Sequence, residues 1–304
     1  MIKPFLGHGG VDEAAVKAMI EWYIQKGCDG VFAVCQSSEM FYLSLDERVR
    51  LAETVEKAAG GRIEVIASGH VSDALDSQIA ELRAISQTGV TAVVLVTNRL
   101  ASDGEDDEVW IRNADRVISA LPDVTFGLYE CPYPYKRLLT QKTLSWCAAS
   151  GRFTFLKDTC CDAGQIREKL GWIQTSSARA GVRPMGLYNA NSATLLESLR
   201  DGADGFSGTM GNLHPELYVW LWKNFRSEPE KAEKLQAQLT LLSALEGQGY
   251  PICAKQHFIE AGIPMTLHTR SVDAATFGPP QRHFLALVPP PGIVPRGKLV
   301  QMVQ

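Results

Sequence analysis

The sequence lacks the features that mark most nucleic-acid-binding and membrane proteins. Its formal net charge is -4 at pH 7, so it has no excess of basic residues to neutralise phosphate groups. No apolar stretch reaches the roughly 18 residues of a membrane-spanning helix, and the amino end has no apolar core of signal-peptide length. The sequence therefore predicts a cytoplasmic protein that binds a small molecule, with no nucleic acid and no membrane as partner.

Metal and dinucleotide signatures are also missing. The seven cysteines form no CxxC pair and the six histidines are scattered, so we expect no metal. The odd cysteine count favours reduced thiols in a cytoplasmic protein. The adjacent Cys160 and Cys161 are either a reactive pair or two small buried side chains. No GxGxxG follows an expected strand, which argues against a bound dinucleotide.

Short β-rich runs alternate with helical patterns of a dozen or more residues, which is typical of parallel strands joined by helical crossovers. Ser44 and Glu47 form a capping-box pattern at the start of one expected helix. Eight strand and helix units favour a (β/α)8 TIM barrel, because doubly wound sheets usually have five or six strands. The expected strands are residues 2–5, 30–34, 63–67, 92–97, 125–129, 153–157, 183–187 and 205–207.

From Pro215 onward the pattern is helical only, and it is followed by a proline-rich stretch that includes three prolines at 289–291. We expect residues 1–225 to form the (β/α)8 catalytic barrel. Residues 226–304 are expected to form a C-terminal helical region packed on it. The first strand is short and looks cropped, since few residues precede the turn at Gly9 and Gly10.

Lys157 closes an apolar run at residues 153–156. A lysine at the end of a buried strand is costly unless its amine reacts. Burial lowers its pKa and leaves a neutral amine, which can attack a ketone to form a Schiff base. The alternative is a lysine whose stem follows the strand end while its ammonium group reaches the surface.

Other polar side chains fall at the carboxyl ends of the expected strands, where barrels of this kind carry their chemistry. Each has an ordinary alternative as a turn, cap or core residue. Their coincidence around one barrel mouth with a lysine favours a site. They are Gln36, Ser37 and Ser38 after the second strand, Tyr129 at the fifth, Tyr188 and Asn189 after the seventh, and Ser207 at the eighth.

Four motifs, in order, resemble the family of class I aldolases and dehydratases that includes dihydrodipicolinate synthase and N-acetylneuraminate lyase. The resemblance covers nearly the whole chain. Residues 250–255 are also similar to a segment of that family's C-terminal helices. The four motifs are residues 34–39 for the GTTGE loop, 129–132 for YxxP, 155–158 for the strand with the Schiff-base lysine, and 202–205 for the entry to the eighth strand.

The resemblance implies that Lys157 attacks a 2-oxo acid and expels water to form an imine, so that no separate cofactor is needed. It implies that Tyr129 shuttles a proton and that Ser37, with the amides around Ser38, holds the substrate carboxylate. A homo-oligomer is expected, since family members are commonly tetramers or dimers. The further expected substrate-binding residues are Gln36, Tyr188, Asn189 and Ser207.

Departures from the family pattern bear on the substrate. Dihydrodipicolinate synthases have a tyrosine pair before an asparagine, where this sequence has Val96 and Thr97 before Asn98. They also have an arginine two residues after the YxxP proline, where this sequence has Pro134, and Arg137 comes later. Cys35, Gln36 and Ser38 replace smaller residues of the GTTGE loop.

We therefore expect a Schiff-base lyase (aldolase) that cleaves or condenses a hydroxylated 2-oxo acid. The expected substrate is a 2-oxo-3-deoxy sugar acid, with pyruvate as the ketone half. One alternative is a dehydratase or a dihydrodipicolinate synthase-like enzyme that uses the same lysine imine. A second alternative is a silent barrel that binds a 2-oxo acid without turning it over.

Overall fold

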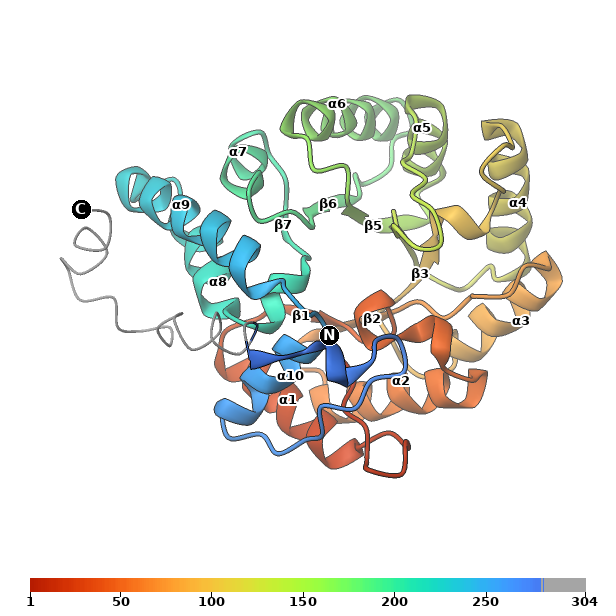
Figure 1. Ribbon diagram of the computed structural model, residues 1–304. Coiled ribbons are helices and arrows are strands. Elements are labelled where there is room, and N and C mark those ends of the chain that lie inside the picture. The colour runs from red at the N-terminus through yellow and green to blue at the C-terminus, as the bar shows by residue number, and fades with distance from the viewer. Residues whose placement is uncertain (280, 282–304) are drawn as a thin grey trace.

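The computed structural model describes residues 1–279 and 281. Seven parallel strands pair in chain order and curl into an open barrel, with helices on its outer side (Figure 1). The predicted TIM-barrel architecture is confirmed, with seven strands rather than eight in the described part of the chain. The strands are β1 (Gly30–Phe32), β2 (Glu64–Ala67), β3 (Ala92–Val96), β4 (Phe126–Tyr129), β5 (Phe153–Asp158), β6 (Gly186–Asn189) and β7 (Gly205–Phe206).

The first predicted strand is wrong. Phe5 makes only an isolated antiparallel bridge with Val11. The backbone here closes a local turn, in which the Leu6 N–H donates to the Gly10 carbonyl at 2.7 Å. Pro4 has no N–H to contribute to a ladder. Among the described residues, β1 therefore pairs with β2 on one side, and no ladder joins it to β7.

The helices begin and end where local chemistry favours it. The predicted capping box of α2 is present: the Glu47 N–H donates to Ser44 Oγ at 3.2 Å, and the Ser44 N–H donates to the Glu47 carboxylate at 3.0 Å. The same helix ends at Gly60, whose φ of 56° is left-handed. The helices are α1 (Glu13–Gln25), α2 (Leu45–Ala59), α3 (Leu75–Ser86), α4 (Asp107–Ala120), α5 (Gln141–Ser150), α6 (Ala163–Ala180), α7 (Leu195–Arg200), α8 (Pro215–Asn224), α9 (Pro229–Glu246) and α10 (Ile252–Glu260).

Strand register decides which side chains enter the barrel. Tyr129, Lys157 and Tyr188 are paired across β4, β5 and β6 at one level. Successive strand residues point to opposite faces, so the residues that follow them face the helices. Asp158 accordingly contacts α6 and Asn189 contacts α7. The seventh predicted strand begins three residues too early, and the observed strand at Gly186–Asn189 includes both Tyr188 and Asn189.

The C-terminal helices lie beside the barrel (Figure 1). The boundary predicted after residue 225 falls between α8 and α9, whose apolar side chains share one cluster with α7. Phe258 of α10 packs edge-on against Trp22 and Tyr23 of α1, with ring centres 4.8 and 5.9 Å apart. The division into a barrel and a helical region stays a prediction, and the proline-rich stretch at 289–291 lies outside the described residues.

Candidate active site

Lys157 is on the interior face of β5, and 7% of its side chain is exposed. Its Nζ lies 4.7 Å from the centre of the Tyr129 ring and 5.7 Å from that of Phe32. Burial lowers the pKa of the Lys157 amine, and the neighbouring thiols of Cys35 and Cys131 act in the opposite direction. The amine therefore faces the barrel interior and not the surface, and a larger share of it is neutral than in an exposed lysine.

The Tyr129 ring lies beside this amine, and its hydroxyl donates to Gln36 Oε1 at 3.4 Å. The Cys131 thiol approaches the same oxygen at 3.6 Å. Burial raises the pKa of Tyr129 well above its ordinary value, and Cys131 and Cys35 raise it further. The phenol thus keeps its proton at neutral pH. A protonated phenol next to a reactive amine is placed to donate to a departing hydroxyl group.

A cavity of about 490 Å³ runs through the barrel interior below these residues. Hydroxyl groups and the lysine line its carboxyl end, whereas carboxylates line the end where the strands begin. Because the carboxylates repel an anion, the hydroxyl end is the favourable place for the carboxylate of a 2-oxo acid. Its lining includes Ser37, Lys157 and Ser207 at the first end, Tyr188 between them, and Asp29, Glu64 and Asp204 at the second.

The side chain of Ser37 is hydrogen-bonded to Tyr250, which precedes α10. Asn212 holds Tyr250 in turn, since its Nδ2 donates to the Tyr250 hydroxyl at 3.0 Å. Tyr250 and Asn212 are site residues that the sequence reasoning missed. The similarity of residues 250–255 to the family's C-terminal segment is the one sequence signal for Tyr250.

The C-terminal segment also fixes the loop that follows β1. Glu39 has a left-handed backbone, with φ of 61°, which few residues other than glycine adopt. Its carboxylate accepts from the N–H groups of Arg270 at 2.6 Å and Ser271 at 2.8 Å. The Lys255 ammonium lies 3.7 Å from its other oxygen. By fixing Glu39, these contacts hold the turn that contains Ser37 in place at the cavity, although Arg270 is more than 200 residues away in the sequence.

Two of the predicted ligands are directed elsewhere. Ser38 Oγ donates to the Cys35 carbonyl and accepts from the Cys35 N–H, both at 2.8 Å, so it caps its own turn. The Asn189 amide donates to the hydroxyls of Thr194 and Ser198, both at 3.0 Å, outside the barrel. The structure brings together the other six predicted residues, and their roles towards a substrate stay predictions: Lys157, Tyr129, Gln36, Ser37, Tyr188 and Ser207.

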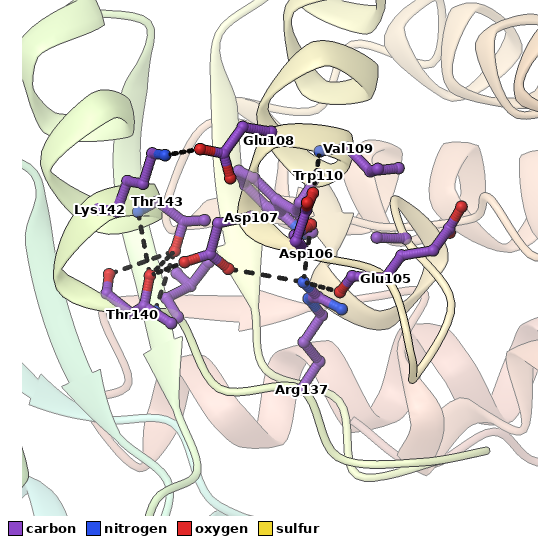
Figure 2. Close-up of polar contacts among 12 residues, drawn as sticks. Glu105, Asp106, Asp107, Glu108, Val109, Trp110, Arg137, Thr140, Lys142 and Thr143 are labelled. Carbon is purple, nitrogen blue, oxygen red and sulfur yellow. Dashed lines mark hydrogen bonds and ion pairs between the residues drawn. The ribbon is translucent and has the colours of Figure 1, made fainter.

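Arg137, in the loop after β4, contacts the backbone of a neighbouring segment and does not line the cavity. Figure 2 shows Arg137 directed at the segment before α4, where its guanidinium donates to the carbonyls of Glu105 and Asp106 at 3.0 and 3.3 Å. Asp107 adds an ion pair at 3.5 Å. The described lining of the cavity contains no arginine. A second carboxylate of a substrate therefore has no guanidinium from this loop.

Asn98, at the end of β3, fastens the same loop. Its Nδ2 lies 2.9 Å from the carbonyl oxygens of both Cys131 and Tyr133. Beside it, Thr97 Oγ1 donates to the Arg137 carbonyl at 2.7 Å. Thr97 thus stands where dihydrodipicolinate synthases have a relay tyrosine, and its hydroxyl donates to the backbone of the loop.

A sequence model of the dihydrodipicolinate synthetase family matches residues 1–272. The chain belongs to this family. Among its relatives, the 4-hydroxy-tetrahydrodipicolinate synthase of Thioalkalivibrio sulfidiphilus is 26% identical over 243 residues, which are 80% of this chain and 79% of that one. The protein of the same name from Alkalilimnicola ehrlichii is 25% identical over 268 residues, 86% and 87% of the two chains.

Solved structures of the family show the same fold. A dihydrodipicolinate synthase from Acinetobacter baumannii, complexed with pyruvate, superposes with a TM-score of 0.81 at 21% identity. A prophage protein of the family from Escherichia coli K12, also complexed with pyruvate, gives 0.83 at 20% identity. Each comparison covers 94% of both chains.

Dihydrodipicolinate synthetase family members are class I lyases that use a covalent Schiff base between a lysine and pyruvate, without an external cofactor. The predicted family and enzyme class are confirmed, and the silent binding barrel is set aside. In the described part of the chain, no group of three or more His, Cys, Asp or Glu residues is arranged to hold a metal ion. No helix there combines the length and apolar character that crossing a membrane requires.

Proposed function

We propose that this chain is an aldolase for a hydroxylated 2-oxo acid, with Lys157 as the imine-forming residue. The observation that supports this proposal most directly is the buried Lys157 amine, which lies 4.7 Å from the centre of the Tyr129 ring at the hydroxyl-lined end of a 490 Å³ cavity. The substrate class proposed is a 2-oxo-3-deoxy sugar acid. In its support, Tyr188 and Ser207 offer hydroxyl groups to a polyhydroxylated chain, and the described residues that line the cavity include no arginine for a second carboxylate.

Cleavage begins when the Lys157 amine attacks the C2 carbonyl. The carbonyl oxygen takes one proton from the amine and one from the Tyr129 phenol, then leaves as water, and a cationic imine remains. The Tyr129 phenolate removes the proton of the C4 hydroxyl. The C3–C4 bond then breaks, its electrons form an enamine, and C4 leaves as an aldehyde. Tyr129 gives its proton to C3 and becomes a phenolate again. Water then hydrolyses the cationic imine, which releases pyruvate and the neutral amine, and the proton set free returns to the Tyr129 phenolate.

A second candidate is favoured by the names of the relatives, which are 4-hydroxy-tetrahydrodipicolinate synthases. Such an enzyme would use the same imine to condense pyruvate with an aldehyde that carries nitrogen. Against it stand Thr97 in place of a relay tyrosine and Arg137 directed away from the cavity. A dehydratase acting through the same imine is distinguished by its product, which keeps every carbon of the substrate.

Borohydride reduction in the presence of pyruvate tests the common step. We expect a reduced adduct at Lys157 by mass spectrometry, and none at this position in Lys157→Ala. No adduct in the wild-type protein, or an adduct at another lysine, would contradict the assignment.

A panel of 4-hydroxy-2-oxo acids of increasing length then tests the substrate. Release of pyruvate plus an aldehyde supports the aldolase, and a product that keeps all carbons supports the dehydratase. Condensation of pyruvate with amino-bearing aldehydes but not with hydroxyaldehydes would favour the synthase.

Assembly and location stay proposals as well. We propose a homo-oligomer, a dimer or a tetramer, in the cytoplasm, in keeping with the commonly oligomeric family. Light scattering on the eluate of a sizing column measures the assembly, and a mass of one chain at micromolar concentration would contradict it.

A further inference from the structure

Three charged side chains are buried together behind β4 and β5. The Lys169 ammonium, from α6, lies 2.6 Å from a Glu130 carboxylate oxygen and 2.5 Å from one of Asp158. The lysine side chain is 2% exposed and both carboxylates are fully buried. Burying ions is costly unless each is paired and hydrogen-bonded, so this cluster needs a reason beyond general stability.

The cluster lies one residue beyond the two proposed catalytic groups. Glu130 follows Tyr129, and Asp158 follows Lys157, which is paired with Tyr129 in the ladder. Because successive strand residues point to opposite faces, the catalytic pair faces the cavity and the carboxylates face α6. One ammonium ion from α6 thus bridges the two strand ends that carry the amine and the phenol.

Further contacts make the bridge rigid. The Glu130 carboxylate also accepts from the N–H groups of Leu139 at 2.8 Å and Thr159 at 3.2 Å. Thr159 Oγ1 donates to the Glu130 carbonyl at 2.6 Å. The second oxygen of Asp158 accepts from the Cys160 N–H at 2.9 Å. These partners lie in the segments that follow β4 and β5, so the cluster ties the two strand ends to each other and to the segments beyond them.

The charges are unequal, since two carboxylates meet one ammonium. Burial raises the pKa of the Glu130 carboxyl and Asp158 raises it further, while Lys169 lowers it. The two carboxylates raise the pKa of Lys169 against the effect of burial. Lys169 is thus held as an ammonium ion. Without it the pKa of Glu130 would rise further, so that Glu130 takes up a proton and the ionic bridge between the two strand ends is lost.

We propose that Lys169, Glu130 and Asp158 form a positioning cluster that fixes the ends of β4 and β5 and thereby sets the distance between the Lys157 amine and the Tyr129 hydroxyl. This proposal rests on the proposed function, in which these two groups react together. None of the three touches the cavity, so they act through the residues next to them. A misplacement of about 1 Å in a reacting pair costs roughly 10²-fold in rate, which gives such a cluster a large effect.

The test compares matched pairs of variants by the rate of imine formation, trapped with borohydride in pyruvate, and by kcat and KM. Lys169→Met removes the bridging charge, and Arg48→Met is its control. Arg48 is 4% exposed and pairs with Glu81 at 3.0 Å, between α2 and α3 and away from the cavity. We expect Lys169→Met to lower the imine-formation rate and kcat at least tenfold, with KM for the 2-oxo acid changed less than threefold. Arg48→Met should keep kcat within threefold even where its unfolding midpoint falls equally.

If Lys169→Met does not fold, a second pair of variants with smaller changes tests the positioning cluster. Thr159→Val deletes one hydroxyl that ties the strand ends, and Thr54→Val deletes a buried hydroxyl that donates to the Arg50 carbonyl at 2.8 Å within α2. We expect a three- to tenfold loss of kcat in Thr159→Val and none in Thr54→Val. The proposal is overturned if Thr159→Val and any folded Lys169→Met stay within twofold of wild type, or if the controls lose as much.

The wild-type time course separates this proposal from the one on which it rests. An adduct that forms in the wild-type protein and slows in the Lys169 and Thr159 variants supports the positioning cluster. Absence of the adduct from the wild-type protein itself would remove Lys157 as the imine lysine and overturn both.

Discussion

Replacing Tyr129 by phenylalanine removes a single hydroxyl from a side chain that is 4% exposed. The ring keeps its edge contact with Phe32, whose centre is 5.5 Å away, and its place beside the Lys157 amine. The phenylalanine cannot make the hydrogen bond that the phenol donates to Gln36 Oε1 at 3.4 Å. A bond of this length contributes at most about 1 kcal/mol to stability, so we expect Tyr129→Phe to fold with an unfolding midpoint close to that of the wild type.

The expected effect on chemistry is much larger. In the proposed mechanism the Tyr129 phenol supplies the proton that lets water leave and later takes the proton of the C4 hydroxyl. Loss of a positioned proton donor typically lowers a rate by about 10²- to 10⁴-fold, which corresponds to about 3 to 5 kcal/mol of activation free energy. Imine formation should still proceed slowly, so a borohydride adduct at Lys157 should accumulate at longer times.

Pyruvate release, followed by coupled reduction with lactate dehydrogenase, gives kcat, and calorimetry gives the unfolding midpoint. The reasoning predicts a loss of kcat of at least a hundredfold with a nearly unchanged midpoint. A kcat within threefold of the wild type would refute the role of the phenol. A kcat loss accompanied by a midpoint lowered by ten degrees or more would show that the hydroxyl is structural.

Two further predictions concern pH. Burial lowers the pKa of the Lys157 amine from 10.5. The rate of adduct formation should therefore rise with pH, with a midpoint below pH 10.5. A midpoint at pH 10.5 or above would contradict a buried nucleophile. Burial also lowers the pKa of His70 from 6.5 to about 4. As the pH falls, His70 is protonated in the unfolded chain before it is protonated in the folded one. His70 therefore leaves the free energy of unfolding unchanged above pH 6.5 and lowers it by up to about 3 kcal/mol as the pH falls to 4. Urea unfolding at pH 7 and pH 4.5 measures this loss, which should shrink in His70→Gln; an equal loss in that variant would rule out His70 as its source.

The sequence was sufficient to predict that Lys157 and Tyr129 lie close together, because both fall at the carboxyl end of an expected strand. Lys157 closes a buried run, and Tyr129 precedes a proline that stops the neighbouring strand. Ser38 and Asn189 show the limit of such reasoning. Ser38 lies in the short 3-10 helix Gln36–Ser38, where its hydroxyl bonds to the backbone of its own turn, and Asn189 lies in β6. A strand turns alternate side chains inward and outward, so a shift of one residue separates a cavity ligand from a turn residue.

Other parts of the site depend on contacts that no local pattern records. Glu39 contacts Arg270, which is more than 200 residues away in the sequence, and Ser37 is hydrogen-bonded to the Tyr250 hydroxyl, which is equally remote in the sequence. Lys169 is one of several charged residues on a helix, and its pairing depends on how α6 lies against the ends of β4 and β5. The first predicted strand failed for a related reason, because its hydrogen bonds close a turn that hydrophobicity alone does not reveal.

Asn98 makes the end of β3 and the loop after β4 a single unit, because one side-chain amide approaches the carbonyls of Cys131 and Tyr133. That loop carries Pro134, where related synthases have an arginine. A loop transplanted from a relative to install that arginine would arrive without this attachment, unless its own carbonyls were presented to Asn98 in the same way. Redesign of the substrate range of this enzyme therefore has to exchange the strand end and the loop together.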